Sequence, residues 1–117
     1  MELGGNAPVL VFDDADLDAA VAGALASKYR NAGQTCVCAN RLLVQERIYP
    51  AFVEKFAAAV AELRVGNGQD ESSQIGPLID PRARDKVDAM VREAVAAGAT
   101  RSHSRLRVFR VGCCRSY

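Results

Sequence analysis

The sequence has no run of about 18 apolar residues, which is the length that a helix needs to cross a membrane. It also lacks the basic and apolar segments of a secretory signal, because Met1 leads directly into Glu2 and a glycine pair. Half of its residues are hydrophobic and a quarter are charged, an ordinary globular composition. We therefore expect a soluble, cytoplasmic protein in a reducing compartment, with no membrane partner.

Acidic residues are absent from residues 99–117, which contain five arginines and carry a formal charge of +5. Residues 1–98 carry −4, the profile of a soluble enzyme body. Five arginines without the residues of a known binding motif between them are weak grounds for nucleic-acid binding, and we expect no such partner. The sequence predicts one compact region, residues 1–98, followed by a divergent arginine-rich tail, residues 99–117.

Two common kinds of site lack their residue patterns. The only histidine, His103, and the four cysteines follow no standard zinc spacing, so no metal site is expected. Gly4 and Gly5 do not complete a phosphate-binding fingerprint, and by themselves they predict a turn.

Short apolar runs alternate with stretches of helical spacing along the chain. The predicted strands are residues 9–12, expected to be buried on both faces, and residues 41–45. The predicted helices begin at Leu17, Pro50 and Pro81 and end near Asn31, Gly66 and Gly98. Leu106 and Val108 could lie in a further edge strand. This order predicts an α/β fold with parallel strands joined by crossover helices.

Glu2 and Cys36 are thirty-four residues apart and together could carry covalent chemistry. An ionised thiol attacks carbonyl carbon, and a carboxylate nearby can activate either the thiol or a water molecule. Taken alone, Cys36 would more often be a small buried residue and Glu2 a solvated acid. The residues around them decide between these interpretations.

Four motifs resemble the aldehyde dehydrogenase superfamily in their order and spacing. They are residues 2–8 (Glu-Leu-Gly-Gly-Asn-Ala-Pro), 12–17 (Phe-Asp-Asp-Ala-Asp-Leu), 33–36 (Gly-Gln-Thr-Cys) and 75–77 (Ile-Gly-Pro). Within the superfamily, residues 29–41 are most similar to succinate-semialdehyde dehydrogenases. The resemblance extends from residue 1 to about residue 98 and implies part of the three-layer sandwich of the catalytic domain.

By this resemblance Cys36 is the nucleophile of an oxidoreductase that converts succinate semialdehyde, or a similar aldehyde, to its acid. The resemblance implies a thiohemiacetal on Cys36, hydride transfer to NAD or NADP, and a remaining thioester. It implies that Glu2 activates the water that hydrolyses this thioester. The backbone N–H of Cys36 would help to stabilise the oxyanion.

Three further residues are candidates. The resemblance implies that the main chain of Leu3 lies near the nicotinamide ring and that Arg30 binds the distant carboxylate of the substrate. Arg30 could equally be a cation that stabilises a helix C-terminus. Cys38 is a packing residue or a redox partner whose reducible disulfide with Cys36 would block the nucleophile.

Members of the superfamily are several times longer, and the resemblance implies that they form homo-oligomers. We expect a fragment without the cofactor-binding domain, and therefore no dehydrogenase turnover by these residues alone. An alternative is a non-catalytic truncated fragment that self-associates or docks on a full-length relative. An intermediate possibility is a cofactor-independent thiol at Cys36 that is acylated by activated esters.

Overall fold

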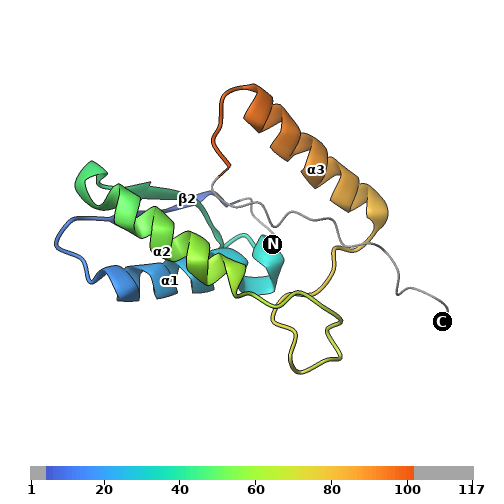
Figure 1. Ribbon diagram of the computed structural model, residues 1–117. Coiled ribbons are helices and arrows are strands. Elements are labelled where there is room, and N and C mark those ends of the chain that lie inside the picture. The colour runs from blue at the N-terminus through green and yellow to red at the C-terminus, as the bar shows by residue number, and fades with distance from the viewer. Residues whose placement is uncertain (1–4, 102–117) are drawn as a thin grey trace. The chain divides into compact units, whose positions relative to one another are not determined.

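The computed structural model describes residues 5–101, which divide into two compact units at residues 77 and 78. Each unit is described separately, and Figure 1 colours the chain from blue at the N-terminus to red at the C-terminus. The first unit contains β1 (Ala7–Val11), α1 (Leu17–Tyr29), the 3-10 turn η1 (Arg30–Gly33), β2 (Ala39–Val44), η2 (Glu46–Ile48) and α2 (Tyr49–Ala61). The second contains α3 (Pro81–Ala96).

Strands β1 and β2 form a two-stranded parallel sheet, with Val9 paired to Leu42 and Val11 to Val44. Helix α1 connects them, as a parallel pair requires. The predicted α/β fold with parallel strands and a crossover helix is confirmed. Each strand begins two residues earlier and ends one residue earlier than predicted, because pairing with the partner strand sets the ends.

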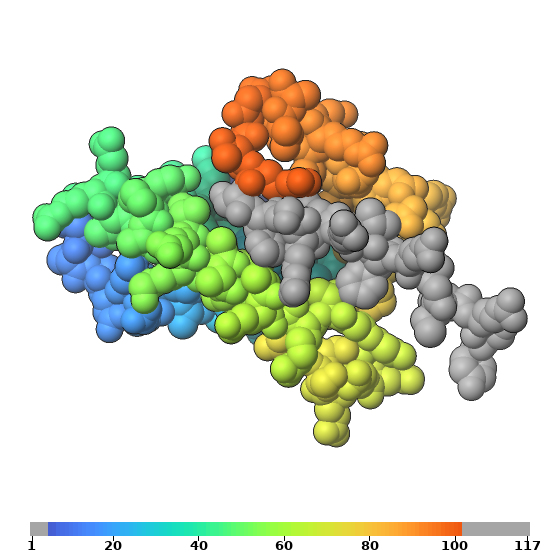
Figure 2. All heavy atoms as spheres, in the orientation of Figure 1, coloured from blue at the N-terminus to red at the C-terminus, as the bar shows by residue number. Residues whose placement is uncertain are grey.

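The core lies between one face of the sheet and helices α1 and α2. Its buried side chains are Val11 from β1, Val21 and Ala24 from α1, and Phe52 from α2. Phe52 stacks on Phe56 with ring centroids 5.6 Å apart. In the space-filling view of Figure 2, α2 lies over α1. Both helices therefore cover the same face of the sheet.

Within residues 5–77, no helix covers the other face of the sheet. Leu10 and Phe12 are each 59% exposed and Leu43 is 54% exposed. Side chains alternate between the two faces of a strand, so these residues point away from α1 and α2. The prediction that residues 9–12 are buried on both faces is therefore wrong, since only one face of the described sheet is covered by helices.

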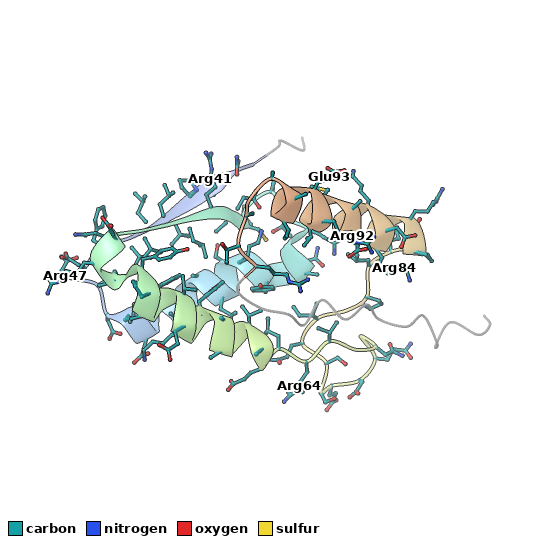
Figure 3. The ribbon with its side chains drawn as sticks, turned by 45° about the horizontal axis from the view of Figure 1, so that its top comes forward. Arg41, Arg47, Arg64, Arg84, Arg92 and Glu93 are labelled. Carbon is teal, nitrogen blue, oxygen red and sulfur yellow. The ribbon has the colours of Figure 1, made fainter. Side chains whose placement is uncertain are left out.

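Helix α2 has Pro50 in its first turn, as predicted, but it ends at Ala61 instead of near Gly66. The chain leaves the helix because residues 64–66 pair with residues 74–75 across a closed loop. The Gln74 N–H donates to the Arg64 carbonyl at 2.8 Å, and the Gly66 N–H donates to the Ile75 carbonyl at 3.0 Å. The side chain of Arg64, labelled in Figure 3, donates to the Ser72 carbonyl at 2.5 Å.

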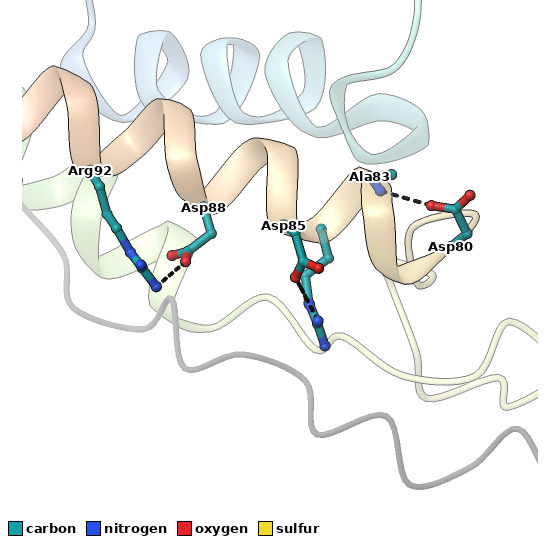
Figure 4. A network of polar contacts seen from close by, with 6 residues as sticks. Asp80, Ala83, Asp85, Asp88 and Arg92 are labelled. Atoms are coloured by element: carbon teal, nitrogen blue, oxygen red, sulfur yellow. Dashed lines mark hydrogen bonds and ion pairs between the residues drawn. The ribbon is translucent and has the colours of Figure 1, made fainter.

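Helix α3 begins at Pro81, as predicted, and the structure shows Asp80 as its N-cap. The Asp80 carboxylate accepts the Ala83 N–H at 2.8 Å, and this bond lowers the pKa of Asp80. Figure 4 shows this cap together with the Asp88–Arg92 ion pair one turn apart on the same helix. Gly98 follows the helix with φ +99°, a backbone conformation that favours glycine.

Some expectations concern residues that the structure does not describe. The edge strand around Leu106 and Val108, and nearly all of the arginine-rich tail, lie outside the described residues. The domain division at residues 98 and 99 stays a prediction. Among residues 5–101 there is no helix that is both long enough and apolar enough to cross a membrane.

Two phenylalanines test where the core lies. Phe52→Ala should lower the free energy of unfolding by about 3–5 kcal/mol, because Phe52 is 2% exposed and its removal leaves a cavity. Phe12→Ala is the matched control, since that ring is largely in solvent, and it should cost less than about 1 kcal/mol. Urea denaturation followed by circular dichroism measures both. Equal losses would contradict this placement of the core.

Candidate functional site

Cys36 lies in the short connection between η1 and β2, and its side chain is exposed. A tight turn carries it: the Cys38 N–H donates to the Thr35 carbonyl at 3.1 Å, with Cys36 and Val37 at the two central positions. Val37 is exposed as well. The turn therefore presents the thiol to solvent, where a substrate can reach it.

The backbone before this turn adopts an unusual conformation. Asn31, Ala32 and Gly33 have φ values of 49°, 55° and 77°, and only the last is a glycine. A left-handed conformation costs a residue with a side chain about 1–2 kcal/mol, and such strain is concentrated at functional sites. The Gln34 N–H donates to the Asn31 carbonyl at 3.1 Å and stabilises the reversal. This reversal ends α1 at Tyr29 and leads the chain to Cys36.

The thiol of Cys38 faces inward. The residue is 1% exposed, and its thiol donates to the Arg30 carbonyl at 3.4 Å and contacts the Thr35 hydroxyl at 2.7 Å. Both Cys36 and Cys38 are free thiols. The predicted redox pairing of Cys38 with Cys36 stays a prediction, and the contacts seen here are those of a packed residue.

Gly5 packs directly on the cysteine turn. A Cβ atom on Gly5 would overlap the carbonyl group of Cys36, so only glycine permits this approach. A bulge in the pairing of β1 with β2 leaves Asn40 unpaired, and its amide donates to the Gly5 carbonyl at 3.2 Å. The same amide accepts a hydrogen bond from Lys28 at 3.3 Å. The end of the Glu-Leu-Gly-Gly motif is therefore held against the backbone of Cys36.

The other predicted site residues have different outcomes. Glu2 and Leu3 lie outside the described residues, so their roles as base and nicotinamide contact stay predictions. Arg30 is the C-cap residue of α1 and is exposed, a position that fits the helix-end interpretation, while its role in substrate binding stays a prediction. Burial raises the pKa of the adjacent Tyr29. This tyrosine packs against Phe56.

Sequence reasoning missed two residues that shape the site. Thr35 contacts the Cys38 sulfur, and Asn40 tethers Gly5. The only sequence signal for Thr35 is its place beside the cysteine. No sequence pattern marks Asn40, because its role depends on the bulge between two strands that lie far apart in the chain.

Comparison with known proteins decides the family. The sequence profile of the aldehyde dehydrogenase family matches residues 1–109. The chain belongs to this family. It is 63% identical over 99 residues to glutarate-semialdehyde dehydrogenase from Pseudomonas putida, a match that covers 85% of this chain and 21% of that protein. It is 61% identical over 99 residues to an NADP(+)-dependent succinate-semialdehyde dehydrogenase from Escherichia coli, covering 85% of this chain and 20% of that protein.

Solved structures agree. The crystal structure of succinate-semialdehyde dehydrogenase from Burkholderia pseudomallei matches with a TM-score of 0.79 and 61% identity, over 85% of this chain and 20% of that one. This aldehyde dehydrogenase chain therefore spans about a fifth of the length of the relatives it matches. The predicted fold class and superfamily are confirmed.

Aldehyde dehydrogenases use NAD or NADP, but Gly5 does not have the surroundings of a phosphate-binding glycine. A phosphate-binding glycine leaves open space for the ligand at its missing side chain. At Gly5 the backbone of Cys36 fills that space. Among residues 5–101, no three His, Cys, Asp or Glu side chains gather closely enough to hold a metal ion.

The packing of Gly5 on the cysteine turn can be tested with alanine. Gly5→Ala should lower the free energy of unfolding by about 1–3 kcal/mol, because the new methyl group meets backbone atoms that have little room to move. Gly68→Ala is the control, since a methyl group at that position would have nothing within 4 Å, and it should change stability by less than about 0.5 kcal/mol. If Gly5→Ala is as stable as the control, the close approach is absent.

Proposed function

We propose that the chain is the cysteine-bearing catalytic segment of an NAD(P)-dependent semialdehyde dehydrogenase. The observation that carries the proposal is the packing of Gly5 against the backbone of Cys36. Glu2 precedes Gly5 by three residues, and a chain extends by at most about 3.5 Å per residue. The contact therefore supports a carboxylate in the neighbourhood of the exposed thiol.

In the proposed chemistry the Cys36 thiolate attacks the carbonyl carbon, and a covalent bond to sulfur forms. With an aldehyde this gives a thiohemiacetal, whose hydride the bound nicotinamide cofactor would accept. Glu2 then removes a proton from the water that hydrolyses the thioester. Because the chain spans about a fifth of the length of the relatives it matches, we propose that these 117 residues alone do not oxidise aldehydes.

The proposed substrate is an aldehyde with an anionic group at its far end. Two relatives are named for glutarate semialdehyde and succinate semialdehyde, both of which carry a carboxylate there. The exposed guanidinium of Arg30, six residues before Cys36, is a candidate to bind it with two parallel hydrogen bonds. The parent enzyme is proposed to be a homo-oligomer.

A second candidate function is association without catalysis. The bare sheet face of Leu10, Phe12 and Leu43 favours it, because large apolar side chains in one place commonly mark an interaction surface. On this alternative the chain self-associates or docks on a full-length relative. It needs neither Cys36 nor Glu2, so the two candidates make different predictions for a cysteine variant.

An activated ester tests the proposal without a cofactor. The thiol of Cys36 should attack p-nitrophenyl acetate, release p-nitrophenolate and retain an acetyl group that mass spectrometry locates on its peptide. Cys36→Ser should reduce this labelling to background, because a hydroxyl is a far weaker nucleophile near neutral pH. The conservative variant Cys38→Ser is the control and should keep it, since serine keeps a donor and an acceptor at this buried position.

Two results would contradict the proposal. Labelling of Cys36 no faster than that of an unstructured cysteine peptide would remove the catalytic assignment and favour association. Reduction of NAD or NADP with succinate semialdehyde by these 117 residues, lost in Cys36→Ser, would show that they are active alone.

A further inference from the structure

Cys36 and Cys38 are two residues apart but differ in the solvent exposure of their thiols. The Cys36 side chain is exposed, whereas Cys38 is 1% exposed. A buried polar group is retained at low cost only when it is hydrogen-bonded. The partners of the Cys38 thiol therefore show what it contributes.

The Cys38 thiol connects two parts of the loop. A thiol has one hydrogen, and here it is donated to the Arg30 carbonyl at 3.4 Å. The Thr35 hydroxyl, 2.7 Å from the same sulfur, is then the donor in the second bond. The Arg30 carbonyl lies at the end of α1, and Thr35 begins the turn that carries Cys36. The Cys38 sulfur is therefore hydrogen-bonded both to the end of α1 and to the turn, which are separated in sequence by the left-handed residues 31–33.

We infer that Cys38 is a positioning residue for Cys36, an assignment that rests on the proposed nucleophilic role of Cys36. Without the bond to Arg30, the left-handed conformation of Asn31 and Ala32 would lose one of the contacts that hold it. The turn would then sample other orientations. A displacement of about 1 Å at a reacting group can cost about a hundredfold in rate.

Acylation and alkylation of Cys36 respond differently to a loss of its positioning. Attack on an ester needs the thiol aligned with a donor for the developing oxyanion, and the expected donor is the backbone N–H of Cys36, whose orientation is set by the turn that the Cys38 N–H closes. Alkylation by iodoacetamide forms no oxyanion and needs only an accessible thiol. Loss of positioning therefore slows acylation much more than alkylation.

Cys38→Ala and Cys38→Ser provide the matched comparison. Alanine removes both bonds, and we expect acylation of Cys36 by p-nitrophenyl acetate to fall about tenfold while alkylation changes less than about twofold. Serine has a donor and an acceptor at the same position, and it should keep the rate within about threefold. Peptide mass spectrometry reports both reactions at Cys36 alone.

Amide exchange separates local loosening from unfolding. In Cys38→Ala the N–H groups of Gln34 and residue 38 should exchange about tenfold faster, while those of α1 stay protected. If the alanine variant unfolds, Thr35→Val provides the test instead, because it removes the hydroxyl at nearly constant volume and should also slow acylation selectively.

The outcomes are distinct. The inference would be overturned if the folded Cys38→Ala variant matched the wild type both in the acylation rate of Cys36 and in the amide exchange rates of the turn. The same result for Thr35→Val would also overturn it. An unreactive Cys36 in the wild type would contradict the proposed function, and the exchange rates would then decide the positioning role alone. Faster turn exchange would support that role, and unchanged exchange would overturn it.

Discussion

The backbones of Gly5 and Cys36 approach so closely that no side chain fits between them, and the site depends on this contact. It joins the end of the Glu-Leu-Gly-Gly motif to a turn thirty-one residues later in the chain. The Asn40 amide, freed by a bulge in the parallel pair, secures the contact through the Gly5 carbonyl. Pairing of β1 with β2 therefore positions the two parts of the site as well as forming the sheet.

The turn itself depends on how α1 ends. Val21 and Ala24 anchor the helix in the core against Phe52, so its C-terminal end is fixed in the first unit. The left-handed residues that follow reverse the chain, and the turn then places Cys36 in solvent and Cys38 in the interior. Core packing thus fixes the end of α1, the left-handed residues reverse the chain there, and this reversal leads to the turn that exposes the Cys36 thiol. This arrangement suits a nucleophile that must be accessible and still oriented.

Local chemistry made part of the fold predictable. Asp16 and Asp80 cap their helices and Pro50 lies in a first turn, because these roles depend on neighbours in sequence. The early end of α2 at Ala61 was not predictable, since pairing across the loop replaces helical bonds. The bare face of β1 was also missed, because an apolar run alone does not show which face helices cover. The motif located Cys36, whereas the partners of its turn required the folded chain.

The central claim is that Glu2 and Cys36 act in one site, and the release of an acyl group from Cys36 tests it most directly. After acetylation by p-nitrophenyl acetate, the intact mass of the chain reports how fast acetate is lost. If Glu2 activates the hydrolytic water, Glu2→Gln should slow this loss by about tenfold or more and leave the acylation rate unchanged. Identical release from the wild type and Glu2→Gln would contradict the account.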